Sequence, residues 1–78
     1  MTVTVARTLD CKGLSCPLPI VKTAQAIRGL AAGDLIEVVA TDPGSVKDFA
    51  AWSKVTGNAL VETDQADGVF RFVLKKKG

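Results

Sequence analysis

Apolar and polar residues alternate along this chain with the period of β-strands in some segments and of α-helices in others. Residues 3–10 are expected to form the first strand, because Val3, Val5 and Leu9 stand among polar neighbours. Residues 35–41, LIEVVAT, are a near-continuous β-branched run, which is typical of a central strand. Two strands are therefore predicted in the first half of the chain, one on each side of residues 17–30, and the second is the more apolar.

The last part of the sequence predicts a β-hairpin. The segments NALVETD and GVFRFVLK have strand character and are joined by a short turn around residues 64–68. Phe70, Phe72 and Leu74 occupy alternate positions of the final strand, so they are expected to share one face.

Two segments have helical periodicity. In residues 17–30 the apolar stripe is formed by Ile20, Ala24, Ile27 and Ala31, which Val21 widens, and Gly33 is the expected stop.

A second helix is expected to be capped by Asp42, with Pro43 at its first position and Gly57 after its end. The expected inward stripe of this helix is Val46, Phe49, Ala50 and Ser53.

The predicted order is therefore β-α-β-α-β-β in a single domain of residues 1–78. Right-handed crossovers would place both helices on one face of a four-stranded mixed sheet. The predicted fold class is α/β, a two-layer sandwich. The other sheet face would be solvated or covered by a partner, and its expected residues are Thr4, Arg7, Glu37 and Arg71.

Composition excludes most catalytic and metal-binding sites. With two cysteines and no histidine, the chain cannot assemble a Ser-His-Asp triad or a Cys-His dyad. Two thiols alone cannot complete a tetrahedral zinc site, so neither a metal nor a cofactor is expected. A net charge of +2 is too small to argue for nucleic acid, and the lysines at 75–77 are expected to be solvated.

No apolar run approaches the roughly 20 residues of a membrane span. The beginning MTVTVARTL alternates like a strand and does not resemble a signal peptide. We therefore expect a cytoplasmic protein without a membrane partner.

The segment GLSCPLPIVKT, residues 13–23, places a cysteine at the start of the first predicted helix. A residue before proline is pushed toward extended geometry, which is the geometry of an N-cap. Cys16 is therefore expected to be the N-cap, with Pro17 and Pro19 as the first and third helical residues. The helix dipole favours a thiolate, while each proline removes an N–H donor, so a mildly activated thiolate is expected.

The stretch LDCKGLSCPLPIVKT resembles the signature of the TusA-like (SirA-type) sulfur carrier proteins, whose hallmark is a Cys-Pro-x-Pro motif at the start of the first helix. The resemblance covers essentially the whole chain and includes Gly-Asp at 33–34 and ATDPGSVKDFAAW at 40–52. The fold of that family, β-α-β-α-β-β, agrees with the order above.

The resemblance implies that Cys16 accepts sulfane sulfur as a persulfide and passes it to a partner protein. Pro17, Pro19 and Gly13 would shape the motif. The implied partners are a donor of the cysteine desulfurase or rhodanese type and an acceptor protein, in tRNA thiolation, cofactor biosynthesis or sulfur oxidation. The chain would then be a relay component rather than a stand-alone enzyme.

Apolar residues around the thiol, Leu14 and Leu18, are candidates for a docking patch that such partners would contact. Cys11 stands at the end of the first predicted strand and is expected to be a packing residue, although the resemblance leaves its role open.

Two other functions stay open. Cys11 and Cys16 could form a reversible disulfide in a thiol redox switch, since four residues separate them and Gly13 could fold that loop. A regulatory or nucleic-acid-binding module is the other alternative, because βα sandwiches serve many functions, but the missing basic patch counts against it.

Overall fold

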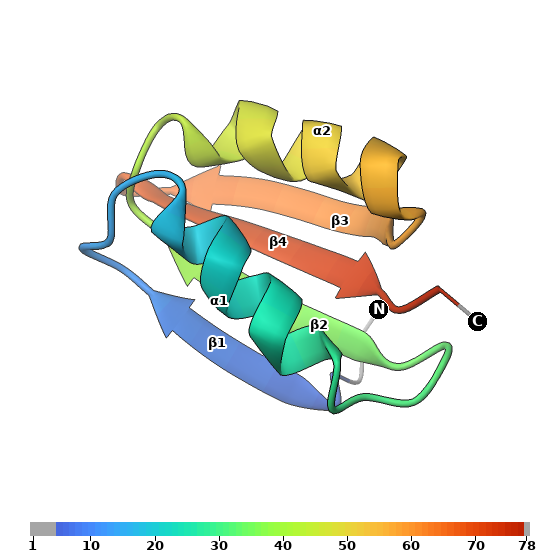
Figure 1. Ribbon diagram of the computed structural model, residues 1–78. Coiled ribbons are helices and arrows are strands. Elements are labelled where there is room, and N and C mark those ends of the chain that lie inside the picture. Colours follow the sequence, from blue (N-terminus) through green and yellow to red (C-terminus); the bar gives the residue numbers. More distant parts are fainter. Residues whose placement is uncertain (1–4, 78) are drawn as a thin grey trace.

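The computed structural model describes residues 5–77 and has both helices on the same face of one sheet, as predicted (Figure 1). The strands are β1 (Arg7–Cys11), β2 (Leu35–Ala40), β3 (Ala59–Ala66) and β4 (Val69–Lys75). The helices are α1 (Leu18–Ile27) and α2 (Ser45–Thr56). The α/β two-layer sandwich is thus confirmed.

The sheet is mixed, with the order β1-β2-β4-β3. β1 is parallel to β2, whereas β4 is antiparallel to both of its neighbours. The β1–α1 and β2–α2 loops leave from the carboxyl ends of the two parallel strands, so they meet at one edge of the sheet (Figure 1). Ligand and reaction sites of α/β folds commonly form at this edge.

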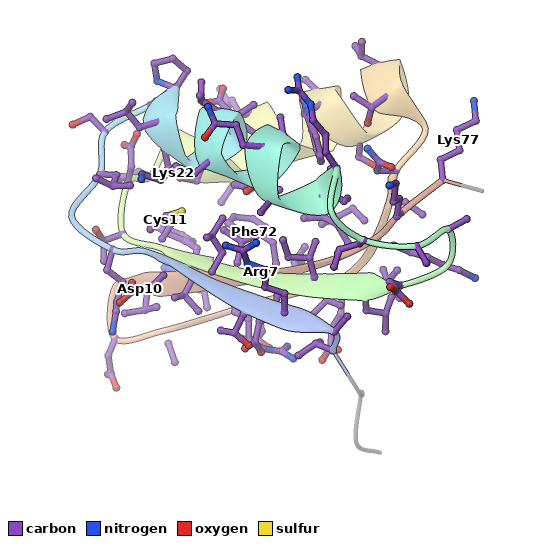
Figure 2. All side chains as sticks on the ribbon, turned by 60° about the horizontal axis from the view of Figure 1, so that its bottom comes forward. Arg7, Asp10, Cys11, Lys22, Phe72 and Lys77 are labelled. Atoms are coloured by element: carbon purple, nitrogen blue, oxygen red, sulfur yellow. The ribbon has the colours of Figure 1, made fainter. Side chains whose placement is uncertain are left out.

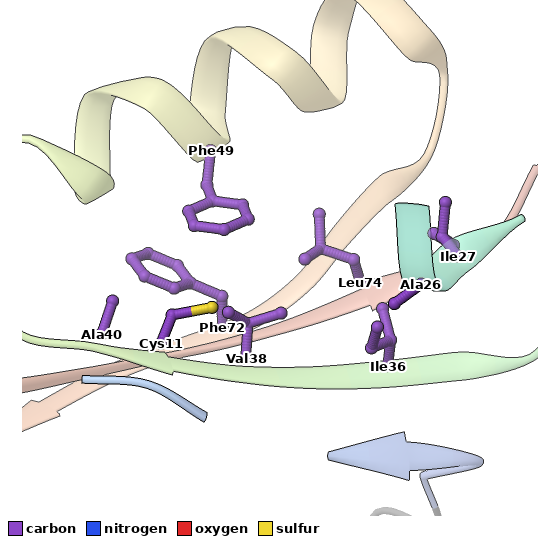
Figure 3. Packing of buried hydrophobic residues seen from close by; sticks show 9 residues of the cluster. All are labelled: Cys11, Ala26, Ile27, Ile36, Val38, Ala40, Phe49, Phe72 and Leu74. Carbon is purple, nitrogen blue, oxygen red and sulfur yellow. The ribbon is translucent and has the colours of Figure 1, made fainter. Parts of the chain in front are cut away.

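The hydrophobic core lies between the helices and the sheet (Figure 3). β2 contributes three fully buried side chains, Ile36, Val38 and Ala40. The antiparallel register places opposite them Leu74, Phe72 and Phe70, which share one face as predicted. From α2, the buried ring of Phe49 stacks on Phe72 with the ring centroids 4.5 Å apart. α2 is therefore anchored to the central strands through aromatic packing.

α1 is shorter than predicted at its C-terminal end. Beyond Ile27 the chain tightens, because the amide of Gly29 bonds to the carbonyl of Ala26 and that of Leu30 to Ile27. These i→i−3 bonds are those of a 3₁₀-type turn rather than an α-helix. Gly33, with φ of 89°, lies in the following turn before β2 and does not end the helix.

The inward stripe of α1 was predicted only in part. Its buried residues are Pro19, Thr23, Ala26 and Ile27. Ile20 and Ala24 are half-buried, while Val21 and Ala31 are exposed. The helix is thus rotated relative to the expected stripe, and residues 19, 23, 26 and 27 face the sheet.

The start of α2 also differs from the prediction. Its N-cap is Gly44, and Asp42 and Pro43 precede the helix. The Asp42 carboxylate is engaged in the loop, where one oxygen accepts a hydrogen bond from the amide of Gly44 at 3.2 Å. Ser45 and Phe49 are the buried positions of the helix, while the predicted Val46 and Ala50 are exposed and Ser53 is half-buried. Gly57 ends the helix as predicted, with φ of 80°.

Arg7 was placed on the wrong sheet face. The register pairs it with Ile36, and since alternate residues of a strand share a face, it lies on the helix side together with Leu9 and Cys11. The predicted beginning of this strand at Val3, and Thr4 on the open face, lie outside the described residues. Within the described chain, β1 begins at Arg7 and runs one residue beyond the predicted end.

The open sheet face carries a cluster of paired charges, as the positions of Glu37 and Arg71 predicted. The guanidinium of Arg71 contacts the carboxylate of Glu37, and it lies 3.2 Å from Glu62 and 3.0 Å from Asp64. These residues come from β2, β3 and β4, so the cluster links three strands on the side away from the helices.

The hairpin turn is tighter than predicted and consists of Asp67 and Gly68. Both residues have positive φ, 52° and 77°, which is the signature of a two-residue type I′ turn. Near its beginning, β3 carries a bulge between Leu60 and Glu62.

Candidate functional site

Two hydrogen bonds fasten the Cys16 loop, residues 12–17, to the loop that follows β2. The amide of Gly13 donates to Thr41 Oγ1 at 2.9 Å. The amide of Cys16 donates to Asp42 Oδ2 at 2.7 Å. Because Thr41 and Asp42 directly follow a buried central strand, they tie the position of the cysteine to the rigid core.

Gly13 sits at the tightest point of the loop. Its φ of 82° is a left-handed conformation that glycine adopts without steric cost. The next amide, that of Leu14, turns back to the carbonyl of Cys11 at 3.2 Å. The loop therefore reverses directly at the end of β1, and the glycine at position 13 permits this reversal.

The helix begins one residue later than the motif predicted. The N-cap is Pro17, the first helical residue is Leu18, and Pro19 is at the second position. The amide of Leu18 bonds to the carbonyl of Ser15 at 2.9 Å, so a turn encloses Cys16 and Pro17 before the helix begins. Cys16 thus precedes the cap and is not itself the N-cap.

The exposed thiol of Cys16 donates a hydrogen bond to the carboxylate of Asp48 on α2. The two residues are 32 positions apart in the chain. Asp48 lies in the first turn of α2, and its amide bonds to the carbonyl of Gly44 at 3.1 Å. The helix that packs through Phe49 therefore also brings a carboxylate to the sulfur.

This environment makes the thiol less acidic than expected. The hydrogen bond to Asp48 raises the pKa of Cys16 above its ordinary value, and partial loss of solvent and the negative charges of Asp48 and Asp42 raise it further. The expectation of a mildly activated thiolate is therefore wrong for the resting structure. It considered only the turn of α1 that follows the cysteine, whereas both carboxylates come from a neighbouring loop and helix.

The other residues named from the sequence have different surroundings. Pro19 is fully buried, and its carbonyl accepts a hydrogen bond from the buried hydroxyl of Thr23 at 2.7 Å. Leu14 is half-buried and packs against the core, while Leu18 is 45% exposed. Of the two candidate docking residues, Leu18 thus offers the larger apolar surface to a partner.

Cys11 is completely buried between the helices and the sheet, where Figure 2 places it beneath α1. Within residues 5–77 both thiols are free. Burial raises the pKa of Cys11, and the charge of Lys22 opposes that rise. Its surroundings are those of a packing residue, because it belongs to the same cluster as Val38 and Phe72 (Figure 3).

A shallow cavity of about 220 Å³ lies elsewhere, between β1 and α1. Its lining residues are Arg7, Leu9, Lys22, Gln25 and Ala26. Sequence reasoning missed it because Arg7 was assigned to the other face.

Across residues 5–77 the structure contains no group of three or more histidine, cysteine or acidic residues that could hold a metal ion. In the same part of the chain, no helix is long and apolar enough to cross a membrane.

Asp42 and Asp48 are the site residues that sequence reasoning missed. One signal for Asp48 was present: it stands near the start of the helix that follows the second parallel strand. Helices that follow neighbouring parallel strands begin at the same sheet edge, so an acidic residue there is close to whatever the first loop carries.

Known proteins with similar sequences are sulfur carriers or putative sulfur carriers. The family model of sulfurtransferase TusA matches residues 7–76. A sulfur carrier protein TusA of Allochromatium vinosum is 48% identical over 68 residues, which are 87% of this chain and 90% of that protein. The putative sulfur carrier protein YrkF of Bacillus subtilis is 46% identical over 70 residues, 90% of this chain, but this chain spans only 38% of its length.

A solved structure supports the fold independently. The crystal structure of a SirA-like protein from Desulfitobacterium hafniense superposes with a TM-score of 0.80, covering 92% of this chain and 99% of that one. Its sequence identity is 23%, so the likeness concerns the fold alone. On the family match and the similarity to curated relatives, the chain belongs to the sulfurtransferase TusA family.

Proposed function

We propose that this protein is a sulfur carrier that accepts sulfane sulfur as a persulfide on Cys16 and passes it to a partner protein. The observation that carries the proposal is the exposed Cys16 thiol on a loop fixed at the carboxyl edge of the sheet, in a member of the TusA family. A carrier needs a thiol that other proteins can reach, and exposure of Cys16 meets that need.

The transfer balances without an external oxidant or reductant. The thiolate of Cys16 attacks the terminal sulfur of a donor persulfide, the donor S–S bond breaks, and the donor leaves as a thiolate. Cys16 then carries the extra sulfur. In the second half, an acceptor thiolate attacks that terminal sulfur and Cys16 leaves as a thiolate. Each half is a thiol exchange at sulfur, so a histidine base is unnecessary.

A sulfur carrier meets both a donor protein and an acceptor protein, and we expect the donor to be of the cysteine desulfurase or rhodanese type, in the cytoplasm. The docking surface we propose is the outer side of the first turn of α1. Leu18 and Val21, 45% and 43% exposed, are three residues apart and therefore neighbours on the helix surface. Leu14, which is half-buried, is the other residue that we propose for partner contact.

Intact mass spectrometry tests the proposal directly. Incubation with inorganic polysulfide or with a persulfidated sulfurtransferase should add the mass of one sulfur atom. Cys16→Ser should abolish this gain, and Cys11→Ser should retain it. If Cys11→Ser abolishes loading equally while the variant remains folded, or mild oxidation of the unmodified protein removes two hydrogens in place of sulfur loading, the redox switch replaces the carrier.

A further inference from the structure

The contact between Cys16 and Asp48 joins two parts of the chain that the fold holds rigidly. On one side, the amide of Cys16 is bonded to Asp42. On the other side, Asp48 immediately precedes Phe49, whose fully buried ring stacks on Phe72. The carboxylate is therefore presented to the sulfur by an anchored helix.

We propose that Asp48 keeps the sulfur at Cys16 protonated, both as the empty thiol and as the loaded persulfide, and that it thereby slows loading and promotes discharge. This inference rests on the proposed carrier function and names the residue that regulates its site.

A carboxylate can only accept a hydrogen bond, so it favours the protonated form of the sulfur that donates to it. Deprotonation of Cys16 would place two negative groups in contact. The charged groups that act on this sulfur are Asp48 of α2 and Asp42 of the β2–α2 loop, and both disfavour the anion. The first turn of α1 contributes only apolar side chains, while Lys22 further along acts on Cys11.

The same pairing acts on the loaded carrier. The terminal sulfur of a persulfide lies one S–S bond, about 2.0 Å, beyond Sγ, so it stays within reach of the Asp48 charge. A persulfide is more acidic than a thiol, and without this carboxylate more of it would be anionic near neutral pH. Only the protonated persulfide is a good target for an acceptor thiolate, because an anionic terminal sulfur repels the anion that attacks it.

Discharge conserves atoms and electrons. An acceptor thiolate attacks the terminal sulfur of protonated Cys16 persulfide, the S–S bond breaks, and the acceptor leaves as its own protonated persulfide. Cys16 departs as a thiolate, takes a proton from solvent, and restores the hydrogen bond to Asp48. No net oxidation or reduction occurs.

Replacing Asp48 by Asn removes the charge and keeps the size of the side chain. For each unit by which the pKa of Cys16 falls, the thiolate fraction near neutral pH rises about tenfold, while intrinsic nucleophilicity falls by roughly threefold. Loading from inorganic polysulfide should therefore accelerate about threefold per unit. A lower pKa also makes Cys16 a better leaving group in discharge. Discharge to dithiothreitol should nevertheless slow, because the loss of the protonated persulfide outweighs this gain. Opposite changes in the two half-reactions are a signature that general damage to the fold would not produce.

The matched control is Asp67→Asn, which removes one negative charge from the exposed hairpin turn, where Asn also tolerates the positive φ of 52°. Asp48→Glu keeps the charge and should restore part of the parent behaviour. Three measurements are made on each variant: the pH profile of iodoacetamide alkylation of Cys16, followed by peptide mass, and the rates of loading and of discharge.

We expect Asp48→Asn to shift the alkylation profile to lower pH, to load faster and to discharge more slowly, with Asp67→Asn unchanged. An alkylation profile of Asp48→Asn that coincides with that of Asp67→Asn overturns the inference, and so does slowing of both half-reactions. If no variant loads sulfur at Cys16, the carrier function itself fails, whereas the alkylation profile still reports whether Asp48 controls the thiol.

Discussion

Substitution of Asp42 by Ala should loosen the Cys16 loop and weaken the fold by a measurable amount. Its carboxylate accepts from the amide of Cys16 at 2.7 Å and from the amide of Gly44 at 3.2 Å. Hydrogen bonds to charged groups contribute about 1.5–3 kcal/mol each, and the partial exposure of this side chain places both at or below the lower end. We expect the free energy of unfolding to fall by about 2 kcal/mol, out of about 4–12 for a domain of this length.

The effect should be concentrated at one amide. Loss of about 1.4 kcal/mol at the Cys16 N–H corresponds to roughly tenfold faster local hydrogen exchange. Residue-resolved exchange by NMR measures this rate, and urea unfolding measures the global loss. The pKa of Cys16 should also fall, because the charge of Asp42 contributes to its rise.

Asp10→Ala is the matched control, since Asp10 accepts from the amide of Lys12 at 3.0 Å in the same loop but has no bond to Cys16. If the Cys16 amide exchanges equally fast in both variants, or no faster than in the parent protein, Asp42 does not hold the cysteine and the description of the loop is wrong.

Three further predictions concern the core and its titration. Phe49→Ala should lower the free energy of unfolding by about 3–5 kcal/mol in urea titration, because the ring is fully buried; an equally large loss in the exposed control Val55→Ala would contradict this. Ser45→Ala should raise the free energy of unfolding by about 1 kcal/mol in thermal denaturation, because this buried hydroxyl has no hydrogen-bond partner within residues 5–77; a lower free energy of unfolding would mean that the hydroxyl does have a partner. Since burial raises the pKa of Cys11, its neutral thiol stabilises the fold below the unfolded pKa of about 8.5, and that stability is lost as the pH rises through the folded value. Cys11→Ala should therefore flatten the alkaline fall of the unfolding free energy, as measured by urea unfolding over a pH series, and an unchanged slope would refute the assignment.

The order of elements could be predicted because the apolar periodicity of each helix or strand is contained in a short stretch of sequence. The run at 35–41 and the alternation of Phe70, Phe72 and Leu74 predict the central strands correctly, since burial on a sheet follows a period of two. Local rules predicted helix starts that are too early. Pro17 and Pro43 were expected at the first helical positions. In the structure each proline lies in a turn before its helix, and these turns are closed by hydrogen bonds to the carbonyls of Ser15 and Asp42.

The site could be predicted only as far as its local motif reaches. Cys16 and its prolines lie in one segment, so the sequence identifies the thiol and its loop. The acidity of that thiol depends on Asp42 and Asp48, which are 26 and 32 positions away and reach it only after the two parallel strands pair. A local rule about helix dipoles predicted the wrong direction of the pKa shift because the decisive charges are tertiary contacts.

The two outer strands have a consequence for how this small domain behaves in a crowded solution. A bare strand edge is a template on which another chain can add a strand. Here β1 spans only five residues in the described chain, and β3 is interrupted by the bulge between Leu60 and Glu62. Short or bulged edges pair poorly with foreign strands. Within the part of the chain that the structure describes, the five-residue β1 and the bulged start of β3 are thus poor templates for strand addition.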